Sequence, residues 1–108
     1  MINKIEGKIA VLDLADYPAE AITSRTILKE KGGTVTFFAY AKGQSLSEHT
    51  TPFEAIAHIL DGRAEITIAG KIYQLGAGDL LQMPANIPHA VAAVEPFKML
   101  LVMIRAGD

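Results

Sequence analysis

Short apolar segments separated by turn residues run through almost the whole sequence, and this pattern limits the fold more than any other feature. Segments of about four to eight residues, rich in β-branched and aromatic side chains, alternate with clusters of glycine, proline or aspartate. No segment carries the apolar period of a helix of three turns. We therefore expect an all-β protein, an antiparallel barrel or jelly roll whose closure removes exposed strand edges.

A pair of glycines organises the first clear hairpin. Residues 24–30 alternate in character as a strand does. Gly32-Gly33 follows, and both glycines can take the positive φ that a tight turn requires. Residues 34–41, TVTFFAYA, are rich in β-branched and aromatic side chains. We expect them to return as the partner strand.

A second turn signal follows an apolar segment. Residues 55–60, AIAHIL, are apolar on both faces apart from His58, a pattern typical of a strand that is covered on both sides. Asp61-Gly62 has the composition of a hairpin turn, so we expect the chain to reverse there. Residues 97–104, FKMLLVMI, are apolar enough to form another central strand.

The N-terminal stretch has the weakest pattern. Residues 9–12 are compatible with the start of an edge strand. Tyr17-Pro18 favours an extended or turn geometry, because the residue before a proline is disfavoured in a helix. A short helix over residues 18–22, capped by Asp16, is the alternative.

Composition excludes several classes of function. A chain of 108 residues has the commonest domain size, so we expect a single domain over residues 1–108. The net charge of -2 argues against nucleic acid and acidic membranes as partners. Cysteine is absent, so any metal must be held by His, Glu, Asp or water. No run approaches a membrane span and the N-terminus does not read as a signal peptide, so we expect a cytoplasmic protein.

Two segments that each open with a glycine deliver one histidine apiece. The first runs from Gly43 to Gly62 and carries His49 after five intervening residues. The second runs from Gly78 to His89 and has a proline after five intervening residues. The two segments therefore form a pair of related motifs, each with one histidine.

These spacings resemble the two motifs of the cupin family. Pro84 stands where the second motif has its proline, and Asn86 stands where glycine is usual. The resemblance implies a small single-domain cupin, an antiparallel β-barrel of the double-stranded β-helix or jelly-roll type. It does not define a reaction, because this fold hosts isomerases, dioxygenases, decarboxylases and plain binding proteins.

The resemblance also implies a metal site, of which this chain keeps a part. His49 and His89 occupy ligand positions, whereas Thr51 stands at the position of the second histidine and Ala55 at that of the acidic ligand. We expect the two imidazoles to bind a divalent transition metal weakly, either zinc, nickel, iron or manganese, because catalytic sites usually supply three protein ligands. No organic cofactor is expected.

Two neighbouring residues are further candidates for this metal site. Glu54 lies one position before the expected acidic ligand, and a β-bulge would turn its side chain inward. His58 shares strand parity with Glu54. If Ala55 faces the barrel interior, His58 lies on the opposite face, so a partly buried or interface histidine is favoured over a metal ligand.

The expected function is the binding of a small polar molecule, with or without a divalent metal, in a pocket lined by His49 and His89. One alternative is a metal-dependent enzyme, a dioxygenase or an isomerase, that uses both histidines and Glu54. Another is a structural or sensory module with a degenerate site. The missing ligands at Thr51 and Ala55 disfavour the enzyme, and whether the protein has any catalytic activity stays open.

We also expect a homodimer. The apolar segments 55–60 and 97–104 carry more apolar surface than one small barrel can cover. The family resemblance implies pairing through sheet faces with exchange of N-terminal strands.

Overall fold

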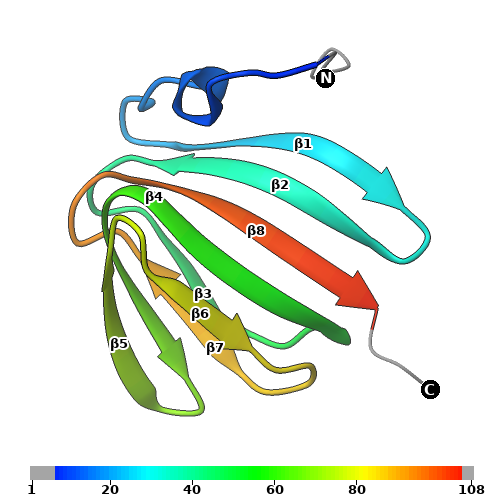
Figure 1. Ribbon diagram of the computed structural model, residues 1–108. Helices are drawn as coiled ribbons and strands as arrows, with labels where there is room; N and C mark the ends of the chain where they lie inside the picture. Colours follow the sequence, from blue (N-terminus) through cyan, green and yellow to red (C-terminus); the bar gives the residue numbers. More distant parts are fainter. Residues whose placement is uncertain (1–6, 106–108) are drawn as a thin grey trace.

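The computed structural model describes residues 7–105, most of which lie in β-strands (Figure 1). The strands are β1 (Ile22–Glu30), β2 (Gly33–Tyr40), β3 (Ser45–His49), β4 (Phe53–Ile68), β5 (Lys71–Gly76), β6 (Leu80–Met83), β7 (His89–Ala92) and β8 (Phe97–Arg105). All their pairings are antiparallel. The all-β prediction is confirmed. Helical structure in this part of the chain is one 3-10 turn, η1 (Val11–Leu14), and none of it has the length or apolar character to cross a membrane.

The long strand β4 belongs to both layers of the barrel. Its first part pairs with β8 and β6, and its last part, from Arg63 onward, pairs with β5 and β7. The strand order is therefore β1-β2-β8-β4-β6 in one layer, called sheet A here, and β5-β4-β7-β3 in the other, called sheet B. Figure 1 shows the two layers curling around a shared interior.

The expected hairpin at Asp61-Gly62 is wrong. β4 passes through both residues without reversing, and a register shift between Ile59 and Asp61 marks the point where it leaves sheet A. Gly62 has a φ of 81°. A Cβ at this position would lie 1.8 Å from the carbonyl oxygen of Pro96. Glycine is therefore required here by the close approach of the segment before β8, and not by a chain reversal.

The N-terminal expectations are also wrong. Neither an edge strand over residues 9–12 nor a helix over residues 18–22 forms; the chain makes η1 and then runs irregularly to Ile22. Leu14 of η1 is buried against Phe37 and Ala39, on the outer face of sheet A. This contact explains the difference, because a four-residue turn has little stability of its own and is held by tertiary packing.

The barrel interior is apolar. Strand alternation sends every second residue of each strand inward, and the resulting cluster contains Tyr40, Ala55, Ala57, Ile59, Ala64, Ile66, Leu75, Met83, Val91, Ala93, Phe97 and Met99. The rings of Tyr40 and Phe97 stack with their centroids 4.4 Å apart. Residues from both sheets share this single cluster, so the two layers are joined by one core.

Candidate functional site

The two motif histidines are direct cross-strand partners. His49 ends β3 and His89 begins β7, and the antiparallel pairing of these strands places the two residues opposite each other. Their ring centroids are 4.4 Å apart and the ring planes are inclined by 66°. Segments that are forty residues apart in the sequence thus bring two imidazoles into contact at one end of sheet B.

Both rings are oriented by backbone carbonyl groups. The Nδ1 atom of His49 lies 2.8 Å from the carbonyl oxygen of Ser47, and that of His89 lies 3.3 Å from the carbonyl oxygen of Ile87. A carbonyl oxygen only accepts hydrogen bonds, so each Nδ1 carries the proton and donates. When the rings are neutral, the lone pair of each is then on Nε2. A metal-binding histidine likewise donates the N–H of one ring nitrogen to a neighbouring group and binds the metal with the other nitrogen.

The two histidines differ in burial. His49 is exposed, whereas His89 is buried, with 6% of its surface accessible. Burial lowers the pKa of His89 below its usual 6.5 and the nearby His49 acts in the same direction, whereas the hydrogen bond to Ile87 opposes them. His89 therefore stays neutral to a lower pH than a free histidine, and a neutral ring can bind a metal or accept a hydrogen bond.

The other two ligand positions implied by the resemblance do not carry metal-binding side chains. The hydroxyl oxygen of Thr51 accepts a hydrogen bond from the backbone N–H of Phe53, at 2.9 Å. Ala55 is buried on the inner face of β4 and presents a methyl group. Over residues 7–105, no cluster of three or more His, Cys, Asp or Glu side chains is arranged to hold a metal. The donor set fits a metal held through two imidazoles only.

Glu54 lies on the outer face of β4. The register of β4 with β8 is regular from Phe53 to Ile59, so the bulge that would turn Glu54 inward does not form there. Its carboxylate accepts a hydrogen bond from the backbone N–H of Ala85 at 3.3 Å and lies 3.5 Å from the side-chain amide of Gln82. These contacts tie the loop after β6 to β4.

His58 shares the outer face with Glu54. It is opposite Leu80 on one neighbouring strand and Leu100 on the other, and it is half-buried between them. The structure therefore does not bring His58 or Glu54 to the pair formed by His49 and His89.

Sequence reasoning missed the two carbonyl groups that orient the histidines. Ser47 and Ile87 each precede their histidine by two residues. The residue type does not show what its backbone carbonyl group binds. The one regularity is that each accepting carbonyl group lies two residues before its histidine.

The chain belongs to the cupin family, whose domain pattern matches residues 36–104. The matched range contains both motifs and the histidine pair. No curated protein matches the sequence.

Solved structures with the same fold cover almost the whole chain. A conserved protein of unknown function from Streptococcus pyogenes is 37% identical, with a TM-score of 0.91, and the match covers 99% of this chain and 96% of that one. A cupin superfamily protein from Desulfitobacterium hafniense is 26% identical, with a TM-score of 0.89 and 97% of both chains covered. A conserved barrel domain protein from Leptotrichia buccalis is 34% identical, with a TM-score of 0.82 over 85% of this chain and 45% of that one. None of these three names states an activity.

Proposed function

We propose that this cupin binds a small polar molecule at the pair formed by His49 and His89, together with a weakly held divalent transition metal. The observation that carries the proposal is the paired orientation of the two rings. Their centroids are 4.4 Å apart, and both Nδ1 atoms are engaged by backbone carbonyl groups. The Nε2 atom of each ring is then the one that carries a free lone pair for a ligand.

The donor chemistry favours zinc, nickel or iron, since these metals accept imidazole ligands. His49 and His89 would hold the metal, and water or oxygen atoms of the bound molecule would complete its coordination. A bound metal would supply a positive charge that attracts and polarises such oxygen atoms. Without it, the same two rings can hydrogen-bond a polar ligand.

Binding is favoured over metal-dependent catalysis because of the missing ligands. Catalytic zinc sites usually have three protein ligands that fix the ion's geometry. Thr51 and Ala55 leave only two here. A two-imidazole site leaves the ion loosely held and open to exchange with chelators.

Metal titration of purified protein tests the proposal. Isothermal titration calorimetry with Zn²⁺ or Ni²⁺ should show binding by the wild type. His49→Ala and His89→Ala should each lower the affinity by roughly 100-fold or more, beyond the range seen for outer-shell partners, because one remaining imidazole cannot hold an ion against water. His58→Ala is the matched control, since it removes a histidine from the outer face, and its affinity should equal that of the wild type.

Circular dichroism should show all three variants folded, because neither site ring contributes much to the apolar core. Metal binding that survives both site substitutions would contradict the proposed location of the metal. If the wild type binds no metal but the two site variants lose polar-ligand binding, the metal part of the proposal is contradicted and the ligand site at the two histidines is supported.

A further inference from the structure

A row of register partners crosses sheet B at the end where the histidine pair lies. His49 on β3 is opposite His89 on β7, His89 is opposite Ile68 on β4, and Ile68 is opposite Lys71 on β5. Directly paired residues of neighbouring strands project to the same face of a sheet. His89 is buried and Ile68 packs against the core cluster, so this face is the inner one. Lys71 therefore lies on the inner face, two strands away from His89.

The position of the Lys71 side chain is supported by Tyr73. Tyr73 follows Lys71 by two residues on β5 and packs against the core cluster, so alternation also places Lys71 on the inner face. The Nζ atom of Lys71 lies 5.1 Å from the centroid of the Tyr73 ring. A cation at this distance from an aromatic face is attracted to the ring. The ammonium group is thus held beside the inner face of β5, and Lys71 as a whole is exposed to solvent.

Burial on the inner faces falls with distance from the bend of β4 at Gly62. In sheet B, Ile66 is fully buried, whereas Ile68, two residues further along β4, is half-buried. In sheet A, Met99 is 2% exposed, whereas Met103, further along β8, is half-buried. The interior is therefore closed near the bend and more accessible at the end that carries the histidines and Lys71.

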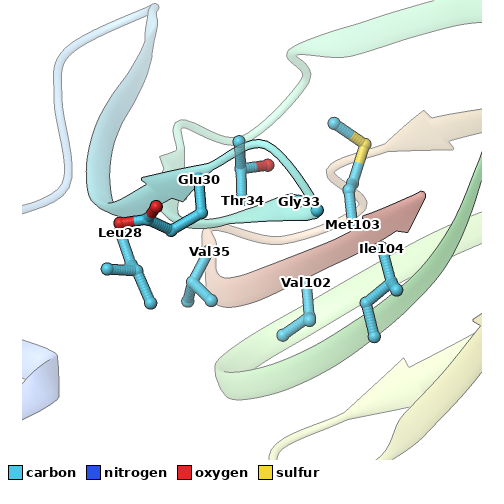
Figure 2. A pocket seen from close by; sticks show the side chains of 9 residues that line it. Leu28, Glu30, Gly33, Thr34, Val35, Val102, Met103 and Ile104 are labelled. Atoms are coloured by element: carbon cyan, nitrogen blue, oxygen red, sulfur yellow. The ribbon is translucent and has the colours of Figure 1, made fainter.

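The half-buried residues of the inner faces are largely apolar. Figure 2 shows Thr34 and Met103 on one side of β2 and β8, and Val35 and Val102 on the opposite, outer side, where they line a groove of about 210 Å³. Met103 belongs to the inner side, with the other partly buried residues that pack against the core: Ile22, Phe38, Ile68, Tyr73, Leu81 and Leu101. These side chains offer apolar contacts to a molecule that enters this end of the barrel.

The charged side chains on the inner faces are cations. Within residues 7–105, the inner faces of β2, β4, β5, β6, β7 and β8 carry no carboxylate, and their charged residues are Lys71 and Arg105. Arg105 ends β8 opposite Phe53, whereas Lys71 lies in the row of the histidines. One ammonium group neutralises one negative charge, so it matches a carboxylate better than a phosphate group, which carries a charge of about −1.5 to −2 near pH 7.

We propose that the molecule bound at the histidine pair is a small carboxylic acid with an apolar body, and that Lys71 binds its carboxylate. This inference rests on the proposed function, because the row that contains Lys71 begins with the two histidines. Neighbouring strands lie about 4.8 Å apart, so the backbones of Lys71 and His89 are roughly 10 Å apart. The flexible stem of Lys71 shortens this gap, and a small organic acid spans the remainder.

Benzoate and benzamide form a matched pair of probes, since they have nearly the same shape and differ in charge. Changes in the amide chemical shifts of the wild type during NMR titration should give a millimolar dissociation constant for benzoate and one about 10-fold weaker for benzamide. Lys71→Met keeps an unbranched side chain and removes the charge at an exposed position, so the fold should persist. It should weaken benzoate binding by about 10-fold and leave benzamide binding unchanged.

Lys42→Met is the control for net charge, because Lys42 is exposed in the turn between β2 and β3, outside the row. It should bind benzoate as the wild type does. A wild type that does not bind benzoate, or that binds benzamide equally well, would overturn the proposed ligand class. Equal weakening by Lys42→Met and Lys71→Met, or weakening by Arg105→Met alone, would overturn the role of Lys71.

Measurements on the histidine variants separate this inference from the proposed function. Lys71→Met should keep the Zn²⁺ affinity of the wild type, whereas His49→Ala should lose both Zn²⁺ and benzoate. If His49→Ala loses benzoate and Lys71→Met does not, the role of Lys71 is overturned and the site at the histidines stands. If His49→Ala and His89→Ala keep both ligands, the proposed function fails, and the inference that rests on it fails as well.

Discussion

The two faces of β4 differ in burial and in polarity over residues 54–59. On the inner face, Ala55, Ala57 and Ile59 are buried and wholly apolar. On the outer face, Glu54, Ile56 and His58 are only half-buried, and two of these three side chains are polar. The comparison teaches that the strand expected to supply an acidic ligand presents only hydrocarbon to the barrel. Its titratable side chains lie on the outer face instead, where Glu54 holds the loop after β6 and His58 is part of the outer surface.

The largest expected effect is the difference in unfolding free energy when a carboxylate is placed first on the inner and then on the outer face of β4. Ala57 is fully buried, so Ala57→Asp leaves an uncompensated carboxylate in the apolar core and should cost about 3–5 kcal/mol of unfolding free energy. His58→Asp, one residue away on the outer face, should cost about 1 kcal/mol or less. Urea denaturation measures both. Equal losses would show that the two faces do not differ in burial.

A carboxylate introduced on the inner face of β4 should restore a metal ligand that this face lacks. Ala55→Glu supplies the acidic group at the position implied by the cupin motif, so Zn²⁺ affinity should rise by about 10- to 100-fold, or roughly 1.4–2.7 kcal/mol. The metal-free variant should unfold at a lower temperature, because the carboxylate is desolvated, and metal should restore its stability.

Ala55→Gln is the control for this change, since it has the same shape and no charge. Calorimetry and thermal denaturation with and without Zn²⁺ distinguish the two variants. If Ala55→Glu binds zinc no better than Ala55→Gln, position 55 does not reach the metal held by the histidines.

The smallest effect is expected on the outer face. Glu54→Gln should leave metal affinity unchanged, because the side chain points away from the barrel. It should cost about 1 kcal/mol or less of unfolding free energy, since a neutral amide oxygen accepts the hydrogen bond of Ala85 less strongly than a carboxylate. Calorimetry and urea denaturation check the two parts. A clear fall in metal affinity would show that Glu54 contributes to metal binding after all.

Features that depend on local spacing are visible in the sequence. The strand expected at 34–41 is observed as β2, and the one expected at 97–104 is observed as β8. The resemblance of two motifs to those of cupins implies that His49 and His89 share one site, and the structure pairs them at the end of β3 and the start of β7. Alternation and turn composition act over a few residues, so they need no knowledge of the rest of the chain.

Only the tertiary structure decided which way β4 continues and where its side chains point. Gly62 has a positive φ that suits a hairpin and a strand bend equally well, and the contact with Pro96 of a distant segment selects the bend. That bend lies after Ile59, so the register before it stays regular and Glu54 faces outward. The burial of Leu14 on a sheet formed by later strands likewise selects η1. In each case the local conformation depends on packing between segments far apart in the sequence, and a pattern of neighbouring residues carries no information about that packing.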